Sequence, residues 1–243
     1  MPLDLNSATI VFDLDGTLVD TAPDLAAAAN YVFALMGLAP VSPAELHPFI
    51  SRGSRAMIEA GLRLHGIAKS EDEVTKLHEQ FFPYYKDNIA ALSRPFEGVP
   101  ELLDALLQAG ARLAVCTNKY ESLSKSLLQQ LGLAERFLAV AGRDTFAVCK
   151  PDPGHLTGTI ALVGGRPDRA VMVGDSEVDI ATAVAAAIPS IGVTFGYTTR
   201  PVGEFGPSAV IDHYREFLPA LARVLAQESW PGAGSGATPP RER

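Results

Sequence analysis

Residues 9–20 read Thr-Ile-Val-Phe-Asp-Leu-Asp-Gly-Thr-Leu-Val-Asp, and this stretch decides the fold of the chain. The apolar run at residues 10–12, closed by a glycine, predicts a short buried strand that ends in a loop. Asp13 and Asp15 stand at that strand end, where side chains two residues apart point to the same side. Two carboxylates held so close repel each other, and an oxygen-bound cation such as Mg²⁺ would relieve the repulsion.

A simpler alternative is that Asp13, Asp15 and Gly16 only form a turn after the strand. The rest of the chain distinguishes the two interpretations. Ligands of a parallel sheet bind at the carboxyl ends of its strands. If Asp13 and Asp15 are catalytic, polar residues suited to the same chemistry should therefore follow the other strands as well.

Composition excludes several classes of protein. The chain has 243 residues, of which 47% are hydrophobic, so a folded core is expected. The net charge of −8 argues against a nucleic-acid partner and gives no reason to expect membrane binding. Cys116 and Cys149 form no CxxC pair, and residues 1–8 show no signal-peptide pattern, so a reduced, cytoplasmic protein is expected.

Residues 21–93 carry helical patterns with no strand between them. Ser42 is expected to cap a short helix that begins at Pro43. Longer helices are predicted at Pro23–Met36, Ser54–Leu64 and Glu71–Ala91. We interpret residues 21–93 as a helical cap domain, hinged near residues 19–23 and 93–96.

From residue 94 onwards strands alternate with helices, which is typical of a parallel sheet covered on both faces. The predicted strands are Arg112–Cys116, Phe137–Ala141, Ala170–Val173, Ser190–Val193 and Ala209–Ile211. The predicted helices are Val99–Gln108, Tyr120–Leu131, Pro153–Val163, Glu177–Ala187 and Tyr214–Gln227. The expected fold is therefore α/β: a Rossmann-like parallel-sheet core (residues 1–20 and 94–227) with an inserted all-helical cap domain. Residues 228–243 are predicted to be a disordered tail.

Polar residues suited to phosphate chemistry follow the later strands and loops. They are Thr117, Asn118, Lys150, Gly174, Asp175 and Asp179. Thr117 can donate to a phosphoryl oxygen through its hydroxyl and backbone N–H, and Lys150 can neutralise a nucleophilic carboxylate. Asp175 can complete the oxygen shell of a metal beside Asp13, and Asp179 can hold metal-bound water or orient Lys150.

This set resembles the four motifs of the haloacid dehalogenase superfamily. The motifs are Asp-x-Asp-Gly-Thr at residues 13–17, Thr117, Lys-Pro-x-Pro at 150–153 and Gly-Asp-Ser-x-x-Asp at 174–179. The resemblance implies that Asp13 is a nucleophile that becomes phosphorylated and that Asp15 is a general acid and base. It implies a Mg²⁺ site at Asp13, Asp15 and Asp175, with Asp179 in the surrounding shell. The dehalogenases lack the second Asp, so Asp15 favours a phosphatase.

The cap segment at residues 51–55 places Arg52 and Arg55 beside Gly53, just before a predicted helix. The N-terminus of a helix favours anions, so these three residues are candidates for binding a second anionic group, such as a carboxylate, on the substrate. A solvated basic loop is the alternative.

Three stretches resemble the bacterial phosphoglycolate phosphatase family: residues 115–119, 85–98 and 192–197. The cap loop departs from that family, which usually has a second Gly and an Ala at the positions of Ser54 and Arg55. The resemblance implies a cytoplasmic, Mg²⁺-dependent hydrolase of a small phosphomonoester, first of all 2-phosphoglycolate, acting as a monomer or homodimer in carbohydrate metabolism. A pyrophosphatase, a sugar phosphatase, a phosphoglucomutase and a non-catalytic module that binds a phosphorylated metabolite remain as alternatives.

Overall fold

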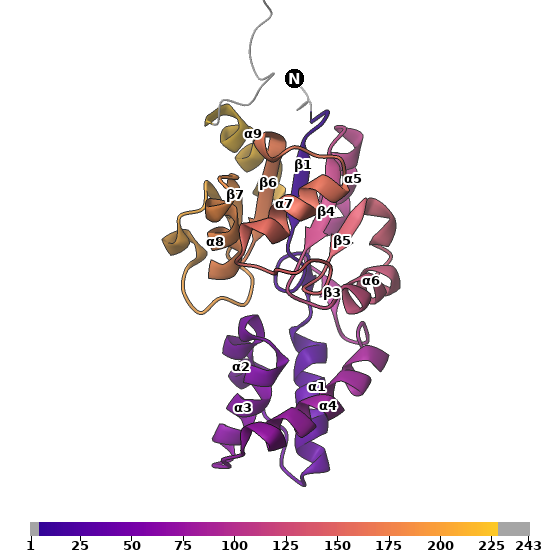
Figure 1. Ribbon diagram of the computed structural model, residues 1–243, viewed down its shortest axis with the longest axis vertical. Helices are drawn as coiled ribbons and strands as arrows, with labels where there is room; N and C mark the ends of the chain where they lie inside the picture. Colours follow the sequence, from indigo (N-terminus) through magenta and orange to yellow (C-terminus); the bar gives the residue numbers. More distant parts are fainter. Residues whose placement is uncertain (1–4, 228–243) are drawn as a thin grey trace, which may run out of the picture.

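The structure is a computed structural model that describes residues 5–227, so the predicted tail at residues 228–243 lies outside the described residues. Figure 1 shows an α/β body and, beneath it, a separate bundle formed by helices α1 to α4. This arrangement confirms the predicted α/β fold with a helical cap.

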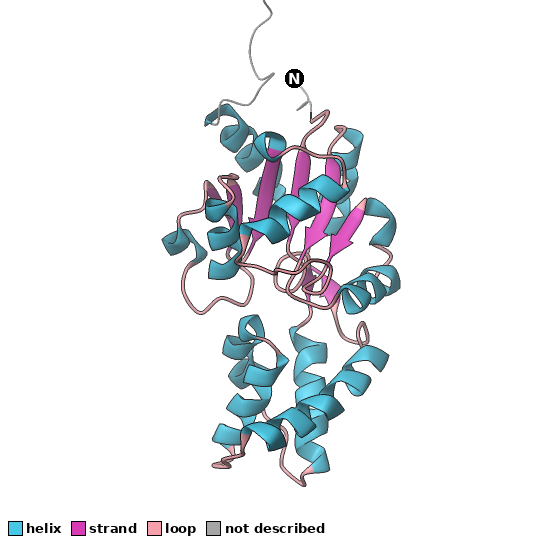
Figure 2. Ribbon diagram, viewed as in Figure 1, coloured by secondary structure: helices cyan, strands magenta, loops and turns pink. Residues whose placement is uncertain are grey.

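The main sheet of the described chain has the strand order β5-β4-β1-β6-β7-β8, and every neighbouring pair is parallel. Figure 2 shows the sheet with helices on both sides. The strands are β1 (Thr9–Phe12), β4 (Arg112–Cys116), β5 (Ala139–Ala141), β6 (Ala170–Gly174), β7 (Ser190–Val193) and β8 (Ala209–Ile211). The helices of this body are α5 (Val99–Gln108), α6 (Glu121–Gln130), α7 (Pro153–Leu162), α8 (Glu177–Ala185) and α9 (Phe217–Gln227).

Strand β1 is buried along its whole length, and its side chains alternate between two hydrophobic clusters. Ile10 and Phe12 belong to the cluster that includes α5, α6 and α9, and Phe12 stacks on Phe217 with ring centroids 6.0 Å apart. Val11 points to the other face, where it packs with residues of α7 and α8. A strand covered on both faces is apolar at every position, which explains the run that precedes Asp13.

Several strand and helix boundaries differ from the sequence-based expectation, among them the starts of β5 and α9. Strand β5 begins at Ala139 and not at Phe137, because the Phe137 amide donates to Ala134 O and closes a 3₁₀ turn. Helix α9 begins at Phe217, after a separate 3₁₀ turn at Tyr214–Glu216.

The cap consists of α1 (Ala22–Leu35), α2 (Pro43–Leu46), a 3₁₀ helix (His47–Arg52), α3 (Ser54–Leu64) and α4 (Glu71–Asp87). Ser42 and Ser70 form capping boxes at the starts of α2 and α4, each with a Glu three residues on. Helix α4 ends at Asp87, short of the predicted Ala91; the Asn88 amide donates to Tyr84 O and Tyr85 O at this end, and the Asn88 side chain also donates to Tyr84 O.

Two linkers join the cap to the core, and they pair with each other. Strands β2 (Val19–Asp20) and β3 (Arg94–Pro95) form a two-stranded antiparallel ribbon, which the sequence analysis did not predict. The buried Asp24 carboxylate, in the first turn of α1, accepts hydrogen bonds from Leu92 N, Ser93 N and Ser93 Oγ. We propose that the domain boundaries and hinges lie at these linkers.

Among the described residues, none of the helices combines the length and the apolar character needed to cross a membrane.

The contact between α1 and α3 gives the first testable prediction. A Cβ placed on Gly61 of α3 would lie 2.0 Å from Cζ of Phe33, a fully buried residue of α1. We therefore expect Gly61→Ala to destabilise the protein by about 1–3 kcal/mol in chemical denaturation, as overpacking does.

The double variant Gly61→Ala/Phe33→Leu is the control, since the shorter leucine makes room for the added methyl group. Its loss of stability should be smaller than the sum of the two single losses. Additive losses would show that the two side chains do not compete for the same space.

Candidate active site

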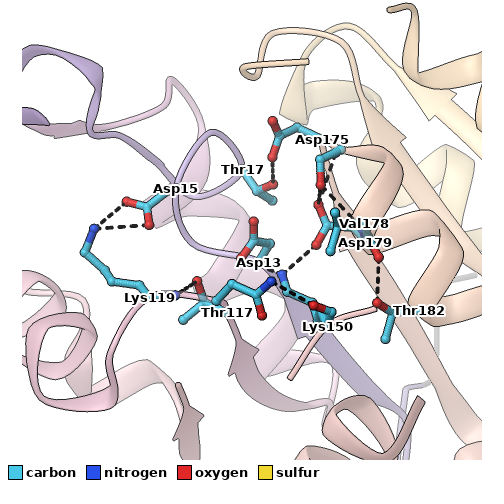
Figure 3. Close-up of polar contacts among 12 residues, drawn as sticks. Asp13, Asp15, Thr17, Thr117, Lys119, Lys150, Asp175, Val178, Asp179 and Thr182 are labelled. Carbon is cyan, nitrogen blue, oxygen red and sulfur yellow. Dashed lines mark hydrogen bonds and ion pairs between the residues drawn. The ribbon is translucent and has the colours of Figure 1, made fainter. Parts of the chain in front are cut away.

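The polar residues that follow the strands meet at one edge of the sheet (Figure 3). Asp13 follows β1, Thr117 follows β4 and Asp175 follows β6, while Lys150 comes from the loop before α7. These residues line one cavity of about 420 Å³, which further residues of the core and residues of the cap complete. The Asp13 amide donates to Val173 O at 2.9 Å, which continues the pairing of β1 with β6 and fixes the position of the carboxylate.

Lys150 is buried and forms two ion pairs. Its Nζ lies 2.8 Å from Asp13 Oδ1 and 2.6 Å from Asp179 Oδ1. Burial opposes the charge of Lys150, but the two carboxylates outweigh it and raise the pKa of the ammonium group above its ordinary value. Lys150 is therefore a fixed cation beside Asp13.

The backbone of Lys150 is held by two neighbouring side chains. Asn118 Nδ2 donates to Lys150 O at 2.9 Å, and Lys150 N donates to His155 Nδ1 at 3.1 Å. Burial and the nearby Lys150 charge lower the pKa of His155 to about 4, so its ring stays neutral and can accept this hydrogen bond.

Three buried carboxylates surround this lysine. Asp13, Asp175 and Asp179 each offer an oxygen, and these oxygens lie within 4.8 Å of one another. Burial raises the pKa of Asp13, against the effect of Lys150. Burial, then Asp179 and Asp13, raise the pKa of Asp175. One ammonium group cannot balance three carboxylates, so the cluster has an excess of negative charge.

Hydrogen bonds hold the two later carboxylates in place. Asp175 accepts from Thr17 Oγ1 at 3.0 Å and from the Tyr197 amide at 2.7 Å. Asp179 accepts at Oδ2 from the hydroxyl and amide of Ser176, at 2.6 and 3.1 Å. Gly174 permits this packing, because a Cβ there would come 2.3 Å from the Cβ of Asp179.

The cluster fits a hard divalent cation. Its donors are carboxylate oxygens, which Mg²⁺ prefers in proteins. Asp13 Oδ1 is buried and accepts no hydrogen bond, although the Lys150 ammonium lies 2.8 Å away. A divalent cation at Asp13, Asp175 and Asp179 would balance the excess charge of the cluster.

The Asp15 carboxylate points away from this cluster (Figure 3). It accepts from Lys119 Nζ at 2.8 and 3.1 Å and from Thr21 Oγ1 at 2.7 Å. The position of the Asp15 side chain therefore does not support its predicted role as a metal ligand. Asp179, which was expected only in the shell around the metal ligands, lies within the cluster itself.

Thr117 and the cap residues line the same cavity. The Thr117 amide donates to Ala141 O at 2.9 Å, so its hydroxyl is left as the donor that can face a phosphoryl group. Arg52 and Gly53 are exposed at the mouth. The Arg55 guanidinium pairs with Glu59 and Glu71 of the cap itself. The substrate-binding roles of these cap residues remain predictions.

Four residues that contact the site were not selected from the sequence. They are Thr17, Tyr85, Lys119 and Tyr197. Thr17 and Lys119 stand in motifs that the sequence analysis quoted, next to residues that it did select. Tyr85 and Tyr197 stand in the family-like stretches 85–98 and 192–197, but they reach the site only through tertiary packing, so the stretches themselves do not show these contacts.

Comparison with known proteins agrees with this geometry. The sequence profile of haloacid dehalogenase-like hydrolases matches residues 10–193. A phosphoglycolate phosphatase of Mesorhizobium japonicum is 50% identical over 216 residues, covering 89% of this chain and 95% of that protein. An N-acetylmuramic acid 6-phosphate phosphatase of Pseudomonas aeruginosa is 36% identical, with coverages of 89% and 95%. The crystal structure of a predicted phosphoglycolate phosphatase from Haemophilus somnus has a TM-score of 0.81 at 29% identity, covering 89% of this chain and 98% of that one.

The chain belongs to the family of haloacid dehalogenase-like hydrolases. Within that family it is a phosphatase that acts on a phosphorylated small molecule.

The excess charge of the cluster leads to a prediction about Asp175→Asn. Asparagine can still accept from the Tyr197 amide and can donate to Thr17, while it removes one charge from the cluster. In EDTA at pH 9, above the raised pKa of about 8 of Asp175, the wild-type carboxylate is ionised, so this variant should melt several degrees above the wild type, since about 1 kcal/mol raises Tm by about 2–4 °C in a protein of this size.

Adding Mg²⁺ should raise the Tm of the wild type and leave that of Asp175→Asn unchanged. Asp168→Asn serves as the control, because Asp168 pairs with Arg166 on the surface and its loss should change little. A lower Tm for Asp175→Asn in EDTA would contradict the proposed repulsion.

Proposed function

We propose that the protein hydrolyses 2-phosphoglycolate in the presence of Mg²⁺, through a phosphorylated Asp13. The observation that carries this proposal is the placement of Asp13 at the end of β1, beside the Lys150 cation, in a cavity that Asp15 also lines. A nucleophile, a positive charge and a second carboxylate in one pocket are the parts that phosphoryl transfer through an aspartyl phosphate requires.

In the first step an oxygen of Asp13 attacks phosphorus and the bond to the ester oxygen breaks. Lys150 offsets the negative charge that accumulates as the carboxylate meets the phosphoryl group, and the Thr117 hydroxyl can donate to a phosphoryl oxygen. Asp15, in its protonated form, gives its proton to the leaving oxygen. A bound Mg²⁺ would neutralise charge between the Asp13 carboxylate and the phosphoryl oxygens.

In the second step water attacks the aspartyl phosphate. Asp15, now ionised, takes a proton from that water, and phosphate leaves as the Asp13 carboxylate is restored. Asp15 is held by Lys119 and Thr21, so it must loosen at least one of these contacts to reach the leaving oxygen.

The choice of substrate rests on the chemistry of the cavity and on the relatives. Both phosphatases named above act on a phosphomonoester that also carries a carboxylic acid. The cavity of about 420 Å³ has cationic side chains on both its core and cap sides, such as Lys119 and Arg52. N-acetylmuramic acid 6-phosphate is therefore the second candidate substrate.

Replacing the nucleophile tests the mechanism. Asp13→Asn keeps the shape of the side chain, so the fold should persist, and turnover should fall by at least about a thousandfold. Incubation with substrate followed by acid quench and mass spectrometry should detect a phosphorylated protein only when Asp13 is present. Asp72→Asn, on the exposed start of α4, should behave as the wild type. Full activity in Asp13→Asn would refute the assigned nucleophile.

A substrate panel tests the proposed specificity. Phosphate release is measured for 2-phosphoglycolate, N-acetylmuramic acid 6-phosphate, glucose 6-phosphate and pyrophosphate, each with Mg²⁺ and with EDTA. We expect the highest kcat/KM for 2-phosphoglycolate and loss of activity in EDTA, because the cluster then has no divalent cation. A preference for another member of the panel would replace 2-phosphoglycolate as the substrate.

A further inference from the structure

We propose that Lys119 and Tyr85 bind the carboxylate of the substrate, and that this binding frees Asp15 for proton transfer. The inference rests on the proposed function, since it assumes a phosphomonoester with an anionic leaving group. It assigns the recognition of that group to one core residue and one cap residue, in place of the arginines of the cap loop.

Lys119 provides a nearly buried cation on the wall of the cavity. Its side chain is 7% exposed, and its Nζ contacts both oxygens of Asp15. Burial opposes this charge, yet Asp15 raises the pKa of the ammonium group above its ordinary value. A ligand that takes the place of Asp15 beside this buried ammonium group must therefore be an anion to balance its charge.

Tyr85 provides a buried hydroxyl on the opposite wall. The residue belongs to α4 of the cap, is 2% exposed and lines the cavity, and its buried hydroxyl has no acceptor for its hydrogen, since the nearby Lys119 ammonium can only donate. A buried hydroxyl left unpaired is costly, so it is a donor in need of an acceptor. The Lys119 ammonium lies 4.7 Å from the centroid of the Tyr85 ring, which brings the two donors together.

A carboxylate is the group that fits these two donors. It accepts hydrogen bonds from an ammonium and from a hydroxyl at once, and its charge matches that of Lys119. The pair lies close to the phosphoryl site, because Lys119 touches Asp15 and Asp15 follows Asp13 by two residues. This proximity suits a short ester such as 2-phosphoglycolate.

The arginines of the cap loop are less suited to this task. Arg55 already pairs with Glu59 and Glu71 and donates to Thr75, all within the cap. Arg52 is exposed at the end of its 3₁₀ helix.

The arrangement also links recognition to catalysis. In the ligand-free protein the Lys119 ammonium forms an ion pair with Asp15. A substrate carboxylate competes for that ammonium and weakens its hold on Asp15, which can then turn to the leaving oxygen. Neutral leaving groups do not compete, so the preference for an acid should appear in kcat as well as in KM.

The test compares 2-phosphoglycolate with 2-hydroxyethyl phosphate, in which a neutral alcohol replaces the carboxylate. The ratio of their kcat/KM values is measured for the wild type, Lys119→Met, Lys119→Arg and Tyr85→Phe. Lys119→Met should lower the ratio by about ten- to a hundredfold, the effect of losing a hydrogen bond to a charged group. Tyr85→Phe should lower it less, and Lys119→Arg should restore part of it.

The matched control is Lys125→Met, which removes an exposed lysine of α6, and Arg55→Met tests the competing assignment of the carboxylate to the cap loop. Both should keep the wild-type ratio. A ratio that survives Lys119→Met, or that is lost in Arg55→Met, would overturn the proposal, and so would a preference confined to KM. Should Lys119→Met fail to fold, Tyr85→Phe carries the test, and an unchanged ratio there overturns the proposal.

The same data separate this inference from the proposed function. A wild-type enzyme that shows no preference for 2-phosphoglycolate refutes the proposed substrate. A wild-type preference that is retained in Lys119→Met refutes the role of Lys119 and leaves the proposed substrate standing.

Discussion

The buried ammonium group of Lys150, shared between Asp13 and Asp179, is the interaction on which the rest of the site depends. Removing one partner from a buried ion pair typically costs about 3–5 kcal/mol, because the remaining charge is left uncompensated. Here the loss would leave three carboxylates within 4.8 Å of one another. The lysine thus favours the ionised form of Asp13, the proposed nucleophile, in a place shielded from water.

The sheet holds this pair in position. Asp13 directly follows the central strand β1, and its amide donates to Val173 O, which continues the hydrogen bonding between β1 and β6. The Asp13 carboxylate therefore has little freedom to move. Lys150 comes from a loop, and Asn118 restricts it by donating a hydrogen bond to the Lys150 carbonyl. Asp179 comes from helix α8, and Ser176 restricts it by donating a hydrogen bond to the Asp179 carboxylate. The chemistry is therefore built on rigid elements, while the cap contributes residues from a separate body.

The fold and the meeting of the polar residues at the strand ends could be predicted from the sequence, because Asp13, Thr117 and Asp175 each directly follow a buried strand. The turn after β1 and the glycine before Asp175 are local signals. The contacts of Lys119, Tyr85 and Tyr197 with the site were not predictable, since each joins segments that are distant in the chain. The β2 and β3 ribbon was missed because two residues are too few to show a strand period.

The pairing of β2 with β3 means that the chain leaves the sheet and returns to it at neighbouring points. An insertion whose ends lie together adds little strain to its host. The helical cap can therefore change in sequence or length during evolution, because both of its ends stay at the β2 and β3 pair. Such changes alter the cap side of the cavity and leave the residues at the strand ends in place.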